Sequence, residues 1–422
     1  MNVLSRTFYR YRRFSKIIRL FLLIAGPGII VMVADNDAGG ITTYAATGSK
    51  YGYDLIWFLV LLGPIAYFIQ EMTVRLGAVT KRGYSEAIFD AFGSFWGWFS
   101  LIDLGIANQL TLITEFIGMT AALSIFGIPP VLTVVIVIIL MGLMVLQGKY
   151  WTWEKIAIFF CLVNLIYIPA AFMLHPSAAD ILKQGMIPHF PGGSASTLFF
   201  FLMANVGTTI APWMIFFQQS SVVDKGTKEK DIPWSQVDTI IGAFFTVLVA
   251  AFCVIVTATV LRGVDIESAA QAATMLMGIN KYVGTFLAIG LFDAGFLGAI
   301  CISLATSWAI GEVFGWAHSL NQKVREAPWF YAYYFSALLI AGIVVLIPGA
   351  PLVLITLFVQ VVATTLLPAA LVFLILLLNN KELMGDFKNT VFQNIINTAI
   401  VVALIFLSTA YAISALFPNV FK

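Results

Sequence analysis

The sequence predicts an all-α integral membrane protein built from two inverted repeats of five helices and one further helix. Three observations lead to this prediction. Of the 422 residues, 60% are hydrophobic and only 10% are charged, whereas soluble domains contain about 25% charged residues. Eleven apolar segments are long enough to cross a hydrocarbon core of about 30 Å. The first and the sixth of these segments are interrupted near their middle by polar, glycine or proline residues.

The eleven predicted transmembrane helices follow one another through short connections that are often marked by proline or glycine. They cover residues 20–47, 54–79, 95–125, 131–147, 153–174, 197–223, 237–261, 284–316, 329–347, 352–378 and 391–416. We expect helices 1–5 to form a first repeat (20–174) and helices 6–10 a second (197–378). Helix 11 (391–416) is additional, and we expect no soluble domain.

Lysine and arginine residues predict how the chain is oriented, because they are concentrated in cytoplasmic loops. With the N-terminus inside, the cytoplasmic segments hold 17 of these residues and the opposite side holds five. Residues 1–19 carry six basic and no acidic residues, and no cleavage site of small residues follows. We therefore expect a cytoplasmic basic arm rather than a signal peptide, and an extracellular C-terminus.

The interruption of helix 1 has the composition of an ion site. The interruption reads Asp35-Asn36-Asp37-Ala38-Gly39-Gly40. An unwound segment is tolerated at membrane depth only where it faces protein or a water-filled cavity, and a carboxylate there costs about 2.5–3.5 kcal/mol. Carboxylate oxygens and free carbonyls are the ligands that a hard cation needs in place of water. The alternative is a kinked helix whose aspartates cap the second segment.

Helix 6 is interrupted by Gly207, Thr208 and Pro212, because proline removes a backbone donor and clashes with the preceding turn. A proline kink in an ordinary span would explain this helix alone. Two interrupted helices in corresponding positions of two repeats, however, indicate a binding site between the repeats near the middle of the membrane.

At these residues the chain resembles the NRAMP family of divalent-metal transporters over essentially its whole length. The resemblance rests on several short motifs taken together. They are Gly26-Pro27-Gly28, the interrupted helix 1, residues 47–53 (TGSKYGY), residues 70–77 (QEMTVRLG), residues 115–118 (EFIG), Val206-Gly207 with Pro212, and residues 360–362 (QVV) before Pro368. The resemblance implies a LeuT-like fold and movement of divalent transition metals by alternating access.

The sequence departs from the family at the metal site. The family's Asp-Pro-Gly-Asn motif falls on residues 37–40, so that Asp37 is kept and the ligand asparagine is Gly40. The metal-binding methionine of helix 6 is Ala211, and a histidine linked to proton movement is Gln218. In helix 3 the family's glutamate is kept as Glu115, whereas its aspartate three residues earlier is Leu112. This pattern is similar to that of the divergent NRAMP-related magnesium transporters, which implies transport of Mg²⁺ and Mn²⁺ without proton coupling.

The substitutions predict a harder site. A thioether favours Mn²⁺, Fe²⁺ or Cd²⁺ over Mg²⁺, and Mg²⁺ needs octahedral oxygen ligands and keeps several waters. Gly40 and Ala211 therefore leave room for water. We expect the metal ligands to be the side chains of Asp37, Thr208 and Gln360 and the carbonyls of Ala34 and Thr208, with Gly40 and Ala211 bordering the same site. We expect four further residues close to the metal or along the ion pathway: Asp35, Asn36, Glu115 and Gln218. We assign no role to Asp103 or Asp293.

The predicted function is transport of divalent cations, Mg²⁺ and also Mn²⁺, by alternating access and without proton coupling. The first alternative is an ordinary proton-coupled Mn²⁺/Fe²⁺ importer. A sodium-coupled amino-acid carrier is disfavoured because two aspartates at the break repel a substrate carboxylate. Nothing in the sequence resembles an enzyme site. We expect no cofactor other than the transported ion, no nucleic-acid or obligate protein partner, and the plasma (inner) membrane of a prokaryote as the location.

Overall fold

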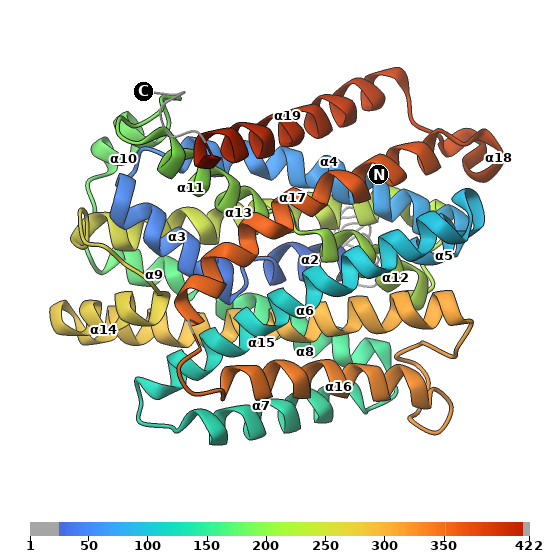
Figure 1. Cartoon of the computed structure of the whole chain (residues 1–422), viewed down its shortest axis with the longest axis horizontal. Helices are drawn as coiled ribbons and strands as arrows, with labels where there is room; N and C mark the ends of the chain where they lie inside the picture. The colour runs from blue at the N-terminus through green and yellow to red at the C-terminus, as the bar shows by residue number, and fades with distance from the viewer. Residues whose placement is uncertain (1–24, 351, 417–422) are drawn as a thin grey trace, which may run out of the picture.

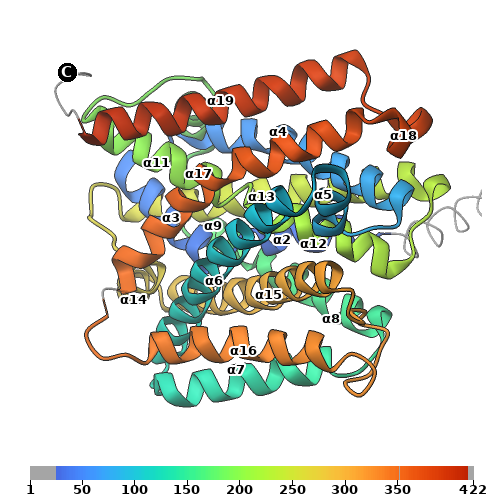
Figure 2. The same ribbon diagram turned by 45° about the vertical axis from the view of Figure 1, so that its right-hand side comes forward.

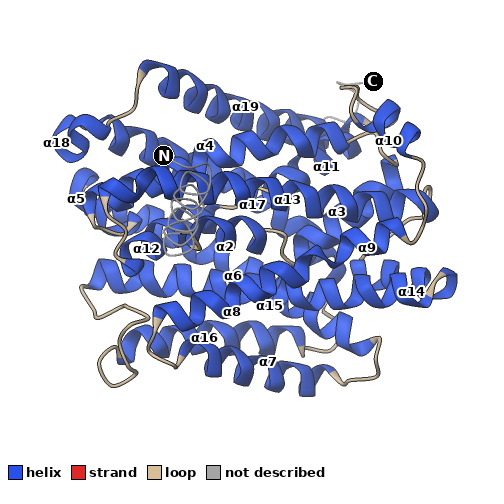
Figure 3. Ribbon diagram, turned by 180° about the vertical axis from the view of Figure 1, so that it is seen from behind, coloured by secondary structure: helices blue, strands red, loops and turns tan. Residues whose placement is uncertain are grey.

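The computed structural model describes residues 25–350 and 352–416, so that the predicted basic arm (1–19) lies outside the described residues. The described chain is helical, without β-strands in these two ranges (Figure 3). Its α-helices are α2 (Pro27–Ala34), α3 (Ala38–Tyr51), α4 (Ile56–Thr80), α5 (Tyr84–Phe92), α6 (Ser94–Ser124), α7 (Pro130–Val145), α8 (Tyr150–Val163), α9 (Tyr167–Phe172), α10 (Ala178–Gly185), α11 (Ala195–Gly207), α12 (Pro212–Lys225), α13 (Ile232–Val260), α14 (Ala269–Ile279), α15 (Lys281–Phe314), α16 (Pro328–Val345), α17 (Leu352–Asn379), α18 (Lys381–Met384) and α19 (Val391–Leu416).

Nine helices in the described ranges are long and apolar enough to cross a membrane, counting α8 with α9 and α11 with α12 as single spans. The two remaining predicted spans are present in shorter form. Helix 1 is divided into α2, with 8 residues, and α3, with 14 residues, and the predicted span 131–147 corresponds to α7, with 16 residues. The count of eleven transmembrane helices therefore stays a prediction.

Helix 1 breaks at the predicted place. Helix α2 ends at Ala34, and Asp37 caps α3 by accepting a hydrogen bond from the Gly40 amide (2.6 Å). The Ala38 amide, which in a continuous helix would donate to the Ala34 carbonyl, donates instead to Glu115 Oε2 (2.9 Å). Two carboxylates thus take up amides that the interruption leaves without helical partners.

Helix 6 is also interrupted where the sequence predicts. Helix α11 ends at Gly207, and Pro212 begins α12, where its missing amide and fixed φ suit the first helical turn. The Ile210 amide still bonds to the Val206 carbonyl (2.8 Å), whereas Ala211 is extended (φ −93°, ψ 149°). The connection between the two halves is therefore a short turn ending in one extended residue.

The half-helices meet inside the bundle (Figures 1 and 2): α2, α3 and α12 are buried along most of their length, and α11 is buried from Leu202 to Gly207. Helix α13 packs along α2, α3 and α4, while α15 packs along α6 and α12, and α17 packs along α11 and α6. Helices α7 and α16 lie side by side at one edge of the bundle, and α19 lies at the opposite edge. The interrupted segments are thus enclosed by protein, as backbone groups without helical partners require at membrane depth.

Two sets of polar contacts hold the beginning of α2. Asp238, in the second turn of α13, accepts hydrogen bonds from the amides of Gly26 (3.0 Å), Gly28 (2.7 Å) and Ile29 (3.3 Å). Lys225, the last residue of α12, donates to Glu154 Oε1 (2.7 Å) and to the Ala25 carbonyl (2.9 Å). The first half of helix 1 (α2) is therefore fixed to α13, α12 and α8 at this end of the molecule.

Arg75, which the sequence places inside the second span, is paired. Its guanidinium nitrogens contact both oxygens of Glu71 (3.0 and 2.9 Å) and donate to Asn389 (2.8 Å). Gln236 also donates to Glu71 (2.9 Å). A buried charge needs such a partner and further hydrogen bonds to offset its lost hydration, so this cation has a structural explanation.

Candidate metal site

The two interruptions face each other at Gly40. A methyl carbon placed on Gly40 would lie 3.2 Å from Asp37 Oδ1, 3.3 Å from the Asp35 carbonyl oxygen and 3.5 Å from Thr208 Cβ. All of these residues are buried, with side-chain exposures of 1% or less for Asp35, Asp37 and Thr208. The structure therefore brings Asp37, Gly40 and Thr208 together, and it adds the Asp35 carbonyl, which the sequence analysis did not single out.

Gln360 approaches the same place from α17. A methyl carbon on Gly39 would lie 2.1 Å from Gln360 Nε2 and 3.3 Å from Asp37 Oδ1. Gln360 is buried, and its Nε2 has no hydrogen-bond partner among the described residues. Because a carboxamide offers both an acceptor and donors, rotation of this group can present its oxygen to a cation beside Asp37. Only glycine fits at position 39 with Gln360 in this position.

The Thr208 hydroxyl donates to the Asn205 carbonyl of its own helix (3.0 Å), which is a common arrangement in membrane helices. Its oxygen keeps acceptor capacity for a cation or a water. The Thr208 carbonyl accepts a hydrogen bond from the Tyr44 hydroxyl (3.1 Å), so this predicted ligand is shared with a tyrosine. Tyr44 lies about two helical turns beyond Asp37 on α3, and the sequence analysis did not identify it as part of the site.

Glu115 lies beside Asp37 and is buried. A methyl carbon on Gly298 of α15 would lie 3.1 Å from both Asp37 Cβ and Glu115 Oε2. Glu115 Oε2 accepts from the Ala38 amide, and its Oε1 lies 3.4 Å from the Thr114 hydroxyl. In this arrangement Glu115 supports the beginning of α3 next to the site. In a continuous helix the Ala38 amide would donate to the Ala34 carbonyl. Because the Ala38 amide donates to Glu115 instead, the Ala34 carbonyl is available to a cation.

Asp35 is the least satisfied charged group of the site. It is 0% exposed, and neither carboxylate oxygen has a hydrogen-bond partner in the described part of the chain. The neighbouring Asn36 donates to the Thr246 carbonyl (3.2 Å). A buried carboxylate without a partner carries a large desolvation cost. A bound cation beside the Asp35–Asp37 segment would offset this cost.

Ala211 has a neighbour that the sequence analysis missed. The Ala211 amide donates to the sulfur of Met214 (3.3 Å), and both residues are buried. Met214 stands three residues after Ala211, in the first turn of α12, so its side chain returns towards the interruption. The structure thus places a thioether at the break of helix 6, although position 211 itself has none.

Gln218 does not belong to this cluster. Its carboxamide donates to Thr239 Oγ1 (2.9 Å) and lies 3.3 Å from Thr73 Oγ1. A methyl carbon on Gly28 would lie 2.7 Å from Thr239, so this network borders the beginning of α2, about two turns from Asp37. Elsewhere, Asp293 accepts from Asn164 (3.2 Å), and Asp103 is partly exposed.

Solved structures share this architecture. A manganese transporter from Eremococcus coleocola superposes with a TM-score of 0.78 at 21% identity, covering 94% of this chain and 88% of that one. Mhp1, a nucleobase-cation-symport-1 family transporter, gives 0.57 at 11% identity (93% and 94% covered), and MhsT in complex with L-phenylalanine gives 0.56 at 14% (92% and 97%). The fold is therefore the LeuT-like fold of membrane transporters.

Sequence comparisons identify the family. The chain is 26% identical over 399 residues to the divalent metal cation transporter MntH of Caldanaerobacter subterraneus, with 91% of each chain covered. It is 25% identical over 405 residues to MntH of Listeria welshimeri, covering 93% of this chain and 90% of that one. Residues 28–414 match the model of the natural resistance-associated macrophage protein-like (Nramp) family. The chain therefore belongs to the NRAMP family.

Proposed function

We propose that this protein carries divalent metal cations, Mg²⁺ together with Mn²⁺, across the membrane by alternating access and without proton coupling. Its relatives are named divalent metal cation transporters, and one of the similar solved structures is that of a manganese transporter. The observation that supports the site best is the convergence of Asp37, Thr208 and the Asp35 carbonyl around Gly40. Oxygen atoms on two interrupted helices are what a cation needs in order to give up part of its hydration shell.

In this proposal Asp37 supplies the charge that binds the ion. Thr208 and Gln360 supply a hydroxyl and an amide oxygen, and the carbonyls of Ala34 and Asp35 complete the oxygen ligands. Within the described residues, no three His, Cys, Asp or Glu side chains are arranged as a metal-binding group. Because Asp37 is the one charged ligand in this proposal, the site leaves positions for water, which suits Mg²⁺ because Mg²⁺ dehydrates reluctantly.

In this proposal the preference for Mg²⁺ comes from Gly40, which has no side chain, and from Ala211, which has only a methyl group, because they leave space for water and offer no soft ligand. Met214 accounts for the acceptance of Mn²⁺. Its sulfur accepts a hydrogen bond from the Ala211 amide (3.3 Å) at the break of helix 6, and in this proposal it approaches an ion that has lost water. Thioethers favour Mn²⁺ and Cd²⁺ over Mg²⁺, so Met214 extends the range of accepted metals.

The membrane potential is a sufficient driving force. It is worth about 2.3 kcal/mol per charge per 100 mV, hence about 4.6 kcal/mol for a divalent ion. Gln218 and Leu112 replace titratable residues of the family pattern, and the three histidines are at positions 175, 189 and 318, outside the helices that form the site. We further propose a cytoplasmic N-terminus, an extracellular C-terminus, and a location in the plasma membrane of a prokaryote.

The second candidate function is a proton-coupled Mn²⁺/Fe²⁺ importer. It is favoured by the names of the relatives and by the position of Glu115 next to Asp37, where a carboxylate can exchange a proton when the ion binds.

Uptake of Mg²⁺ and Mn²⁺ into proteoliposomes containing the purified protein tests the proposed selectivity. At an inside-negative potential and equal pH on both sides, we expect both metals to enter, with Mg²⁺ uptake saturating and competing with Mn²⁺ for the same carrier. Entry of Mn²⁺ with exclusion of Mg²⁺ at millimolar concentration would contradict the proposal and support the second candidate.

A further inference from the structure

An apolar cavity of about 510 Å³ lies over the first half of helix 6, between α4 and α19. We call it the α11 slot. It is lined by residues of α4 (58–65), of α11 and the turn after it (195–210) and of α19 (400–407), and by Phe190 in the connection before α11. Helix α19 packs against α17 and α11 and makes little contact with α4. The three helices of the slot lie together at the edge of the bundle that α19 forms (Figures 1 and 2).

The slot is a recess in the surface that faces the lipid. Every described residue that lines it is apolar. Its rim continues into side chains on the outside of the bundle, such as Leu61 (48% exposed) and Phe406 (69% exposed). In a membrane-spanning chain such side chains contact hydrocarbon. A recess that nothing fills leaves its lining without van der Waals contacts, so the slot requires an apolar occupant from the bilayer.

The floor of the slot is helix 6 itself. Leu202 and Val206 line the slot but are only 4% and 2% exposed, and Ile210 lines it in the interruption. Along α11, Ala195 and Val206 are separated by about 16 Å at 1.5 Å per residue. This length is about half of a hydrocarbon core of about 30 Å. The slot therefore has the depth of one leaflet, which is the length over which an acyl chain extends.

The mouth of the slot has the composition of a membrane–water interface. The rings of Trp57 and Phe190 are in contact, with centroids 5.5 Å apart, and Trp57 Nε1 donates to the His189 carbonyl (3.0 Å). His189 Nε2 lies 3.4 Å from Asp54 Oδ1. Tryptophan is enriched where the hydrocarbon meets the headgroups, and polar groups directly beside the apolar rim mark the headgroup level.

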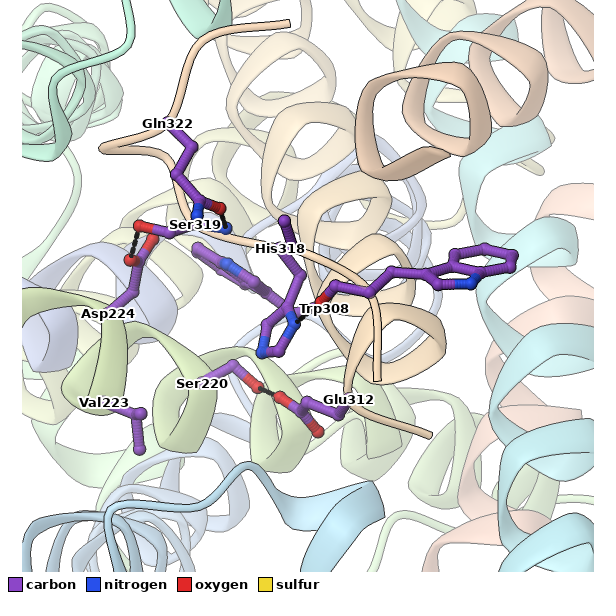
Figure 4. A pocket seen from close by; sticks show the side chains of 10 residues that line it. Ser220, Val223, Asp224, Trp308, Glu312, His318, Ser319 and Gln322 are labelled. Carbon is purple, nitrogen blue, oxygen red and sulfur yellow. Dashed lines mark hydrogen bonds between the residues drawn. The ribbon is translucent and has the colours of Figure 1, made fainter. Parts of the chain in front are cut away.

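Two other cavities differ from the slot. A polar cavity of about 290 Å³ at the opposite end of helix 6 is lined by the hydrogen-bonded pairs Ser220–Glu312 and Ser319–Asp224 (Figure 4), which do not suit an acyl chain. An apolar groove of about 530 Å³ lies between α4 and α13, and none of the described residues that line it belongs to an interrupted helix. This second groove provides a matched control.

We propose that the α11 slot binds one acyl chain of a phospholipid, with the headgroup beside Trp57 and His189 and the end of the chain against Val206. In the predicted orientation this lipid belongs to the outer leaflet. Its chain packs on the half-helix that ends at Gly207, directly before the predicted metal ligand Thr208. A lipid is thus part of the surroundings of the helix 6 interruption.

The test is photolabelling of the purified full-length protein in phosphatidylcholine vesicles. The probe is a trace of phosphatidylcholine with a diazirine at the end of one acyl chain, and mass spectrometry of peptides locates the inserted carbene. We expect insertion at Leu202 or Val206, which lipid outside the slot does not reach. A second probe with the diazirine next to the headgroup should label Phe190 or Ala195 instead.

Two tryptophan variants show whether the label enters through the slot. Ala403→Trp places an indole in the slot and should lower labelling of Leu202 and Val206 about 5-fold or more, because a close-packed ring leaves no room for a chain. Ala251→Trp, in the groove between α4 and α13, should leave this labelling unchanged.

Labelling confined to exposed side chains such as Phe406 would overturn the proposal, and so would labelling of Leu202 and Val206 that persists in Ala403→Trp. If Ala403→Trp proves unstable on size-exclusion chromatography, the two probes on the wild-type protein still decide, because equal labelling of Val206 by both would contradict a chain bound with its end at the floor. Metal uptake is not measured, so failure of the transport proposal would leave this result unchanged.

Discussion

Asp37→Ala is expected to reduce the uptake of Mg²⁺ and Mn²⁺ to the level of protein-free liposomes. Asp37 is buried between the two interruptions, and its Oδ1 lies nearest to the space around Gly40. A divalent ion entering this space loses part of its hydration, and neighbouring hydroxyls, amides and carbonyls carry no net charge to replace it. Uptake by the purified variant in proteoliposomes, compared with wild type at equal protein content, measures the effect.

Asp37 also caps α3 through the Gly40 amide, so the structural contribution must be separated from the charge. Asn is about as good a cap as Asp, and Asp37→Asn keeps a side-chain oxygen for this amide while removing the charge. We expect Asp37→Asn to be as inactive as Asp37→Ala. The lost cap alone costs about 1 kcal/mol, so both variants should remain monodisperse in detergent. Near-normal uptake by either variant would move the essential charge to Asp35.

Adding a soft ligand and filling the space at Gly40 should reverse the metal preference. We expect Gly40→Asn combined with Ala211→Met to raise the ratio of Cd²⁺ to Mg²⁺ uptake at least 10-fold. The new thioether favours the softer ion, and the asparagine fills space that a hydrated Mg²⁺ requires. A methyl carbon on Gly40 already lies 3.2–3.5 Å from three neighbouring groups, so the larger side chain must occupy the site itself.

Met214→Leu is the matched opposite change, since it removes the sulfur at the break with little change in volume. Competition assays should show Cd²⁺ and Mn²⁺ affinity reduced several-fold, with Mg²⁺ uptake within twofold of wild type. If the double variant carries Mg²⁺ as well as wild type does, the explanation of positions 40 and 211 is wrong. If Met214→Leu lowers uptake of all three metals equally, the sulfur has no role in selectivity.

Much of the fold could be predicted because hydrophobic length and interruption are local properties of a membrane sequence. Both breaks lie where glycine, proline and polar residues interrupt apolar segments, between Ala34 and Ala38 and between Gly207 and Pro212. The short helices α5, α10 and α14 were not predicted. They lie in connections between predicted spans and are too short to produce a membrane-length apolar pattern.

The candidate site could be predicted only in part. The convergence of Asp37, Thr208 and Gln360 follows from the two interrupted helices and the family pattern. The contacts of Tyr44 with Thr208 and of Asp238 with Gly28 join residues 164 and 210 positions apart, and no local pattern encodes such pairs. The sulfur of Met214 was not predicted, because the family pattern has its methionine at position 211, three residues earlier, and the helical turn that returns the Met214 side chain to the break is not visible in that pattern. The place of Gln218 along the ion pathway stays a prediction, and its hydrogen bonds are to Thr73 and Thr239.

The central claim, that a divalent cation moves without protons, is tested by measuring both species in the same vesicles. Proteoliposomes loaded with a pH-sensitive dye are held at a clamped inside-negative potential, and Mg²⁺ or Mn²⁺ is added outside. Our account predicts metal uptake that increases with the potential and no metal-dependent acidification. Acidification that accompanies metal entry and disappears in Glu115→Gln would contradict the claim, and it would establish the protein as a proton-coupled importer.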